Sequence, residues 1–223
     1  MSLTALKRQP ADQLATQALK NSILAGEFKP GERLTEAALA DQFAVSRGTV
    51  RAALHQLSND GLVVLRPYAG WSVATIGQQD LWEIYTLRSG LERVAARLAA
   101  ERIDEAGRTR LTGARDSFFA ACERSDRKAS LDYDFALHHC IIELSGNGRL
   151  AIQYQMVEQQ IRLFINSTYG PAPNMLVAIA HHAPIIDAIL AGDGATAASL
   201  SEDHVLSEGA RVFKQAQEAA DGD

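Results

Sequence analysis

The sequence has few of the residues that mark secreted or membrane proteins. Of its 223 residues only two are cysteines, Cys122 and Cys140, and they form no CxxC motif. We therefore expect a reducing compartment and no disulfide framework, although their spacing leaves a pairing open. The first ten residues contain no long apolar run, so we expect no secretory signal, and no window approaches the length of a membrane span. These absences predict a cytoplasmic protein with no membrane partner.

The stretch from Leu34 to Val73 has the strongest local signals of the chain. It predicts two short helices joined by a tight turn, because Thr35 and Ser46 are each suited to cap the helix that follows. Apolar residues recur at helical spacing after both caps and predict buried faces: Leu39 and Phe43 in the first helix, then Val50, Leu54 and Leu57 in the second. Two short strands follow, Leu62–Leu65 and Trp71–Val73, separated by turn residues.

Polar residues gather on the other side of the second predicted helix. Arg47 and Arg51 lie one turn apart in its first turns, with Thr49 nearby. In a helix-turn-helix these turns reach base edges, where Arg can donate two hydrogen bonds to guanine. A solvated arginine face on an ordinary helix pair is the alternative. The hairpin favours DNA, because its tip, with Arg66, Tyr68 and Gly70, could act as a wing that reaches phosphates or the minor groove.

The charge of the chain is unevenly distributed. The net charge is −5, yet residues 1–75 hold eight Lys and Arg against six Asp and Glu, which is +2, and the rest hold 14 against 21, which is −7. This asymmetry fits a small DNA-binding head on an acidic body. With so few cations, strong nonspecific DNA affinity is not expected.

Four spaced motifs in the first part of the chain agree with one family. They are KPGERL at 29–34, LA at 39–40, VSRGTVRAAL at 45–54 and GLV at 61–63. Together they resemble the winged helix of GntR-type bacterial transcription regulators, over residues of about 10 to 75. The chain departs from the family at Ala44, where a Gly is usual, and at Ala37, where many members carry a DNA-contacting Arg.

The resemblance implies a DNA-binding domain over residues 1–75 that recognises double-stranded operator DNA. It implies that Arg47, Thr49, Arg51 and the wing residue Gly70 contact the operator, with Arg33 helping through the backbone. We add Ser46, which begins the recognition helix, and Tyr68 of the wing tip as candidates.

Residues 78–223 show helical periodicity and no strand signal. We predict six helices that form an antiparallel bundle, with breaks at Ser145–Gly146, at Gly170–Pro173 and near Gly192. The predicted fold is therefore mainly α, with an N-terminal winged helix-turn-helix and a C-terminal helical bundle. At about 145 residues, the second part is large enough for a core of its own.

Four residues of the predicted bundle could gather around a metal ion. Asp134 and His138 are one turn apart on one helix. His182 and His204 lie ten residues before and twelve after the turn near Gly192, so they should lie level on neighbouring helices. One carboxylate and three imidazoles suit Zn²⁺, Ni²⁺, Fe²⁺ or Mn²⁺. The alternative is a set of surface or hydrogen-bonded core histidines, and because His139 and His181 adjoin His138 and His182, one of each pair must face elsewhere.

This pattern, with SGN at 145–147 and IDAI at 186–189, resembles the FCD effector domain of the FadR subfamily, and six helices resemble its VanR-like branch. The resemblance implies that Asp134, His138, His182 and His204 hold a divalent metal. It departs at Leu137, where Phe is usual. It also implies that Arg88 binds an effector carboxylate, whereas Glu92, one turn along, holds structure; by spacing alone the two are a surface ion pair.

Taken together, these features predict a metabolite-responsive transcription regulator, most often a repressor in such families, that binds DNA as a homodimer and a small carboxylate in its bundle. Two alternatives remain. A metal with open positions could make the protein an enzyme that acts on a small carboxylate. The metal could instead be purely structural, with no effector.

Overall fold

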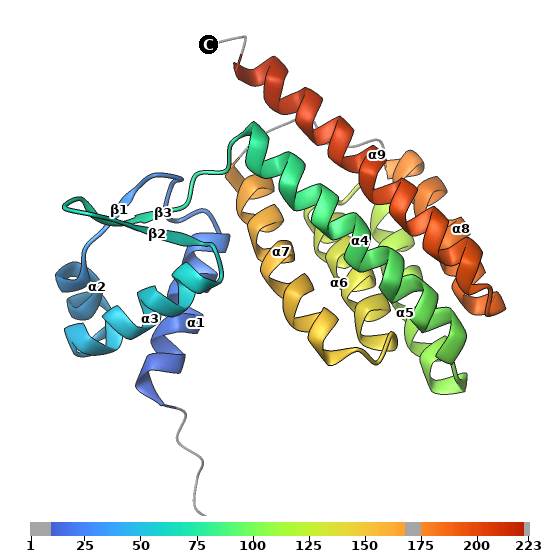
Figure 1. Ribbon diagram of the computed structural model, residues 1–223, viewed down its shortest axis with the longest axis horizontal. Helices are drawn as coiled ribbons and strands as arrows, with labels where there is room; N and C mark the ends of the chain where they lie inside the picture. The colour runs from blue at the N-terminus through green and yellow to red at the C-terminus, as the bar shows by residue number, and fades with distance from the viewer. Residues whose placement is uncertain (1–9, 168–174, 221–223) are drawn as a thin grey trace, which may run out of the picture. The chain divides into compact units, whose positions relative to one another are not determined.

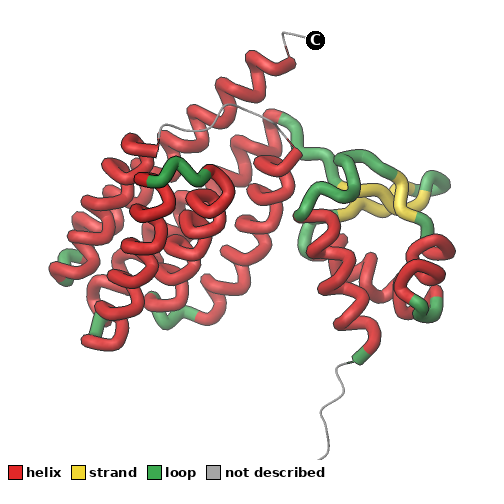
Figure 2. The backbone as a smooth tube through the Cα atoms, turned by 180° about the vertical axis from the view of Figure 1, so that it is seen from behind, coloured by secondary structure: helices red, strands yellow, loops and turns green. Residues whose placement is uncertain are grey.

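The computed structural model describes residues 10–167 and 175–220. Contacts between Cα atoms divide the chain into two units, residues 1–76 with 159–169, and residues 77–158 with 170–223. The break predicted at Gly170–Pro173 lies outside the described residues. Figure 1 labels the elements, and Figure 2 shows that the strands are confined to the first unit.

The first unit is a winged helix-turn-helix. Its helices are α1 (Ala11–Leu24), α2 (Glu36–Phe43) and α3 (Arg47–Asn59), and its strands are β1 (Arg33–Leu34), β2 (Val63–Arg66) and β3 (Gly70–Val73). The strands form an antiparallel sheet in the order β1-β3-β2, with Arg66 opposite Gly70 at the tip of the hairpin. The predicted core residues Val50, Leu54 and Leu57 of α3 are buried.

Local signals explain the helix-turn-helix. The Thr35 hydroxyl accepts a hydrogen bond from Ala38 N at 3.4 Å, and the Ser46 hydroxyl accepts one from Thr49 N at 3.1 Å, so both predicted caps are confirmed. Ala44 ends α2 in the left-handed conformation, with φ of +53°. An L-residue with a Cβ pays roughly 1–2 kcal/mol there, which explains why glycine suits this turn.

The second unit consists, in its described residues, of six helices, as predicted. They are α4 (Gln78–Arg102), α5 (Glu105–Glu123), α6 (Arg127–Leu144), α7 (Gly148–Ser167), α8 (Met175–Ala191) and α9 (Gly194–Ala220). Only residues 148–158 of α7 belong to this unit, because the division by contacts assigns the rest of the helix to the first unit. Helix α4 packs against α6, α8 and α9, and α5 packs against α6 and α8. Both cysteines are buried in this unit with free thiols.

Small residues let α9 lie close along α4. Four alanines of α4, at 95, 96, 99 and 100, are buried in the core. At Gly209 of α9 an added Cβ would lie 2.8 Å from Tyr85 Cβ, so only glycine fits this contact. This packing brings residues of α9 against the polar side chains of α4, where the candidate site lies.

In the described part of the chain, none of the helices combines the length and apolar character that crossing a bilayer requires.

Candidate metal centre and DNA interface

Three histidines from three helices meet inside the second unit. His138 of α6, His182 of α8 and His204 of α9 are all buried, and each offers a ring nitrogen within 4.8 Å of those of the other two. The ring centroids of His182 and His204 lie 4.3 Å apart. This confirms the prediction that the two residues lie level on neighbouring helices, which came from counting residues from the turn near Gly192. The adjacent His139 and His181 are more exposed than His138 and His182. This agrees with the prediction that one histidine of each adjacent pair faces away from the cluster.

Hydrogen bonds at the outer ring nitrogens fix the tautomers of two of these histidines. His182 Nδ1 lies 2.8 Å from the Ala178 carbonyl oxygen, which can only accept, so Nδ1 donates. His138 Nδ1 lies 2.6 Å from Glu92 Oε2, and it likewise donates to the ionised carboxylate. In the neutral imidazoles both Nε2 atoms therefore carry lone pairs, the arrangement typical of metal-bound histidines.

These lone pairs converge with the carboxylate of Asp134. His138 Nε2 lies 3.2 Å from His182 Nε2, and Asp134 Oδ1 lies 3.0 Å from His182 Nε2. Asp134 Oδ2 lies farther away, 3.9 Å from His138 Nε2. Three electron-rich atoms so close together require either a proton on His182 or a cation between them.

The spacing fits a single metal ion. Two donors bound to one ion at about 2.0–2.1 Å lie roughly 2.8–3.4 Å apart when the bond angle is between about 90° and 109°. The distances of 3.2 and 3.0 Å at His182 Nε2 fall within this range. Both ring nitrogens of His204 are buried and have no hydrogen-bond partner among the described residues, which leaves either one free to bind. The four residues therefore fit a divalent cation.

The electrostatics of the site favour the metal-binding form of His204 and Asp134 and oppose that of His182. Burial, followed by repulsion from His182 and His138, holds the pKa of His204 well below its ordinary value, so this imidazole is neutral at pH 7. Burial alone would raise the pKa of Asp134, but the hydrogen bond from His182 and nearby cations hold it below its usual range. For His182, burial opposes the charged form, yet the interactions with Asp134 give a net rise in pKa.

Arg88 and Glu92 form a buried pair beside the histidines. Arg88 Nε lies 2.6 Å from Glu92 Oε1, and both side chains are less than one-twentieth exposed, so the interpretation of this spacing as a surface ion pair is wrong. Burial opposes ionisation of Glu92, but Arg88 and His138 hold its pKa far below the usual range. Glu92 thus connects Arg88 to His138. Arg88 Nη1 also lies 3.5 Å from Glu208 Oε2 of α9.

Several buried polar atoms around Arg88 have no partner among the described residues. They are Arg88 Nη2, the hydroxyls of Tyr85 and Tyr154, and both ring nitrogens of His204. The Tyr85 ring lies 5.8 Å from Arg88 Cζ. Burial, followed by repulsion from Glu92, raises the pKa of Tyr154 well above its ordinary value, and Arg88 opposes this rise. Buried polar groups are nearly always hydrogen-bonded, so this cluster is suited to a polar ligand.

The candidate DNA-contacting residues lie on the surface of the first unit. Arg47 is exposed at the start of α3, and Ser46 and Thr49 are hydrogen-bonded to each other through their hydroxyls at 2.9 Å. The Arg51 guanidinium is held by Glu36 of α2 through two bonds of 2.8 and 2.7 Å. Glu36 therefore orients Arg51, and DNA would have to compete with Glu36 for the two guanidinium donors that form these bonds.

The remaining three candidates lie in the sheet. Tyr68 is fully exposed in the turn between β2 and β3, with φ of +62°, and Gly70 follows with φ of +82°. Arg33 is exposed on the edge strand β1, opposite Ser72. The exposed ring of Tyr68 at the tip of the hairpin is therefore accessible to a molecule that binds the first unit.

Two family models match the chain. The model of the FCD domain matches residues 83–207, and that of bacterial regulatory proteins of the gntR family matches residues 12–73. This chain belongs to the GntR family of bacterial transcription regulators that carry an FCD domain.

The chain is similar to other regulators of this kind. It is 43% identical over 87 residues to the HTH-type transcriptional regulator YdhC of Bacillus subtilis, a match that covers 39% of each chain. It is 28% identical over 204 residues to the HTH-type transcriptional repressor GlaR of Escherichia coli, covering 84% of this chain and 89% of that one. The solved structure of E. coli McbR/YncC shares the fold, with a TM-score of 0.78 and 22% identity over 93% of this chain and 99% of that one. The family and these relatives are transcription regulators, not enzymes.

Sequence reasoning missed several residues of this GntR protein's site. The structure adds Glu92, Tyr85, Tyr154 and Glu208 to the surroundings of the site, and the sequence predicts none of them as a ligand-binding residue. One signal was available for Glu208, because it lies one turn after His204 on the same face of α9. No pattern in the sequence distinguishes the two tyrosines from ordinary core aromatics.

Proposed function

We propose that this GntR protein is a cytoplasmic, metabolite-responsive repressor. Its winged helix binds double-stranded operator DNA as part of a homodimer, and its FCD domain binds a divalent metal together with a small organic acid. The observation that carries the proposal is the buried group of His138, His182 and His204 beside Asp134, next to unpartnered polar atoms of Arg88 and two tyrosines.

The metal would be Zn²⁺, Ni²⁺, Fe²⁺ or Mn²⁺, all of which accept imidazole and carboxylate ligands. His138, His182, His204 and Asp134 would hold it, and Glu92 would orient His138 through the hydrogen bond at Nδ1. When bound, the metal would supply positive charge and open coordination positions for an oxygen ligand.

The chemistry around Arg88 favours an acid as the effector. Its Nη2 group has no partner, and it is a donor suited to a carboxylate oxygen. Glu208 lies 3.5 Å from Nη1 and its side chain is a quarter exposed, so it is the weaker of the two acidic partners of Arg88. An incoming carboxylate could replace Glu208, while the tyrosine hydroxyls bind its remaining polar atoms.

An effector can change DNA binding only through its different affinities for two arrangements of the protein. We propose that the acid favours one relative placement of the two DNA-binding heads of the dimer. Two heads read two half-sites of a palindrome, so a change in their placement alters operator affinity.

The proposal is tested by measuring operator affinity with and without candidate acids. A binding sequence is first selected from random duplex DNA with the full-length, metal-loaded protein. Small mono- and dicarboxylates are then screened by thermal shift, and each acid that binds is added to a fluorescence anisotropy titration of the selected DNA. We expect at least one acid to change operator affinity by about 5- to 150-fold, the usual range of allosteric coupling. An acid that binds tightly yet leaves operator affinity unchanged would contradict the mechanism.

Arg47→Ala should weaken binding to the selected DNA by about 5- to 150-fold, because one bidentate contact to a base contributes about 1–3 kcal/mol of discrimination. The measurement is the same anisotropy titration at fixed salt concentration. Arg110→Ala is the matched control, since it removes an arginine from α5 whose side chain is 53% exposed, and it should leave affinity unchanged. Equal affinities of Arg47→Ala and the unaltered protein would show that α3 does not read the DNA through this residue.

A purely structural metal is a second candidate, because a cation that joins α6, α8 and α9 would hold the bundle together whether or not an acid binds.

A further inference from the structure

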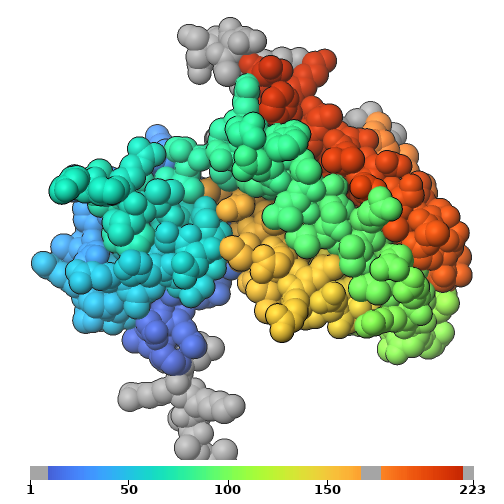
Figure 3. Space-filling model, viewed as in Figure 1, coloured from blue at the N-terminus to red at the C-terminus, as the bar shows by residue number. Residues whose placement is uncertain are grey.

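A carboxylate of α2 holds the guanidinium of Arg51 along one edge. Arg51 Nε lies 2.8 Å from Glu36 Oε1, and Arg51 Nη2 lies 2.7 Å from Glu36 Oε2, so the two groups are joined by a pair of parallel hydrogen bonds. This geometry fixes the plane of the guanidinium as well as its position. The Arg51 side chain is nevertheless 60% exposed. In Figure 3 the atoms of α2 and α3, in light blue and cyan, lie at the surface of the first unit.

Glu36 is itself held in place. It is the first residue of α2, directly after the Thr35 cap, where the helix dipole favours a carboxylate. Only 21% of its side chain is exposed. The hydrogen bond from Arg51 lowers the pKa of Glu36 below its ordinary value, and burial opposes this shift. Trp71 and Arg47 lower the pKa further, so the carboxylate is ionised at pH 7.

Glu36 uses only two of the five N–H donors of the Arg51 guanidinium. They are the N–H of Nε and one N–H of Nη2. The second N–H of Nη2 and one N–H of Nη1 point away from the side chain at the end of the guanidinium. This terminal pair of donors matches the O6 and N7 acceptors of guanine. A base can therefore be bound at this end without displacing Glu36.

The charge of Glu36 favours a base over a phosphate as the target of Arg51. A phosphate bound at the end of the guanidinium would lie near an ionised carboxylate, and the two anions would repel each other. The O6 and N7 atoms of guanine belong to an uncharged base, so they avoid this cost. Arg51 also lies in the second turn of α3, within the part of a recognition helix that contacts base edges.

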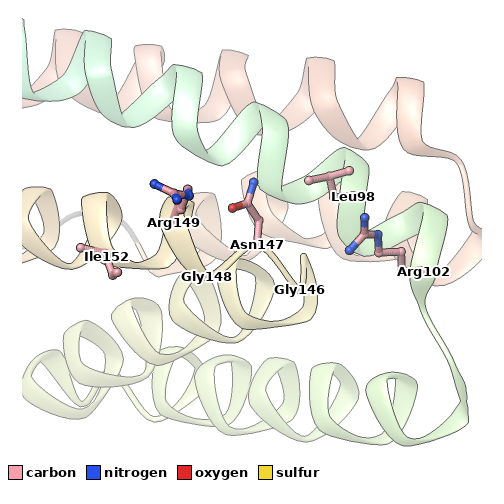
Figure 4. Close-up of a pocket in the computed structure, with 7 residues that line it drawn as sticks. All are labelled: Leu98, Arg102, Gly146, Asn147, Gly148, Arg149 and Ile152. Atoms are coloured by element: carbon pink, nitrogen blue, oxygen red, sulfur yellow. The ribbon is translucent and has the colours of Figure 1, made fainter.

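Two arginines of the second unit show the contrasting arrangement. Arg102 and Arg149 line a hollow between α4 and α7, and Figure 4 shows their side chains on either side of Asn147. Among the described residues, no acidic side chain lines this hollow, so an anion that entered it would meet no carboxylate there. The arrangement at Arg51 differs because its carboxylate partner makes a neutral acceptor the better ligand.

From these observations we infer that Glu36 is a positioning residue for DNA recognition, which holds Arg51 so that the end of the guanidinium reads a guanine of the operator. Glu36 acts through Arg51 and touches no base itself. This inference rests on the operator binding of the proposed function and assigns a base to Arg51. A change at Glu36 should therefore alter the choice of base at one position, whereas a change in charge alone would alter affinity for all sequences alike.

The test measures how strongly each variant discriminates between bases. Operator DNA is selected with the full-length protein, and each base pair of one half-site is then replaced in turn in a fluorescence anisotropy titration. The pair at which Arg51→Ala removes the discrimination is the one that Arg51 reads, and we expect a preference for guanine of about 5- to 150-fold there. Glu36→Gln should lower this preference by about two- to fivefold, the effect of a partly exposed ion pair, and leave the other positions unchanged.

Two further variants separate positioning from charge and from folding. Asp41→Asn is the matched control, since Asp41 is an exposed acid of the same helix, and its loss should leave the preference for guanine unchanged. Glu36→Gln/Arg51→Ala should discriminate no worse than Arg51→Ala alone, because Glu36 acts only through Arg51. A distorted first unit would instead add a further loss in the double variant.

Several results would overturn the inference and leave operator binding standing. They are an unchanged preference in Glu36→Gln, a further loss in the double variant, or a base other than guanine at the position that Arg51 reads. A fourth is a change of about 0.9 in the slope of log affinity against log salt concentration in Arg51→Ala, since a lost phosphate contact has this effect. A protein that selects no DNA sequence would overturn the proposed operator binding as well.

Discussion

Glu92→Gln should lower the free energy of unfolding by about 3–5 kcal/mol, because it leaves the Arg88 guanidinium charged and buried with only the distant Glu208 to balance it. The carboxylate of Glu92 lies 2.6 Å from Arg88 Nε and 2.6 Å from His138 Nδ1. The single carbonyl oxygen of glutamine can accept from only one of these buried donors, and its amide group faces the other. Urea unfolding followed by far-UV circular dichroism, with all proteins free of metal, measures the change.

The chain offers a matched control on the same helix. Arg97 and Glu101 have the same i, i+4 spacing, but their side chains are 52% and 48% exposed and their closest atoms lie 3.6 Å apart. Glu101→Gln should therefore change stability by at most about 0.5 kcal/mol. Arg88→Met/Glu92→Leu should recover most of the loss, because apolar residues of similar size often replace a buried pair without cost. A loss below about 1 kcal/mol in Glu92→Gln would show that Arg88 is not held in a low-dielectric site.

The two pairs on α4 also show where sequence reasoning reached its limit. Arg88–Glu92 and Arg97–Glu101 are identical as patterns, yet one is buried and the other is exposed. The difference comes from α9 and α6, which cover the first pair, and the contact between Glu92 and His138 spans 46 residues of sequence. Local spacing carries no information about such a contact, so the buried pair and its link to the histidines could not be predicted.

The winged helix was easier to predict because its signals are local. The caps at Thr35 and Ser46 and the apolar spacing of α3 act within one or two helical turns, and they define the elements without knowledge of the rest. Strand β1 was not predicted, because its formation depends on a partner far away in the sequence. It has only two residues, Arg33 and Leu34, and exists because it pairs with β3 almost forty residues later.

The histidine cluster could be predicted in part. The turn at Gly192 fixes the relative level of α8 and α9, so counting residues from it predicted that His182 and His204 would meet. The tautomers that make the cluster suitable for a metal could not be predicted, since they depend on Glu92 and on the Ala178 carbonyl.

Binding of Zn²⁺ should raise the free energy of unfolding by about 4 kcal/mol when free metal exceeds its dissociation constant a thousandfold, provided that the unfolded chain binds it weakly. His182→Ala/His204→Ala should abolish this gain, and elemental analysis of protein purified without chelator should find close to one metal ion per chain only in the unaltered protein. Acidification should weaken binding, because protons compete with the metal for the lone pair of His182, whose pKa is raised mainly by Asp134 against the effect of burial.

The sequence supplies matched controls at the neighbouring positions. His139→Ala and His181→Ala remove imidazoles adjacent to His138 and His182 but outside the cluster, so they should keep the metal and the stability gain. Equal metal contents in all variants, or none in the unaltered protein, would contradict the site. A chelator then separates the two roles of the metal. If the metal is only structural, removing it should destabilise the bundle equally with and without acid, whereas an effector that binds at the metal should lose its own stabilising effect when the metal is removed.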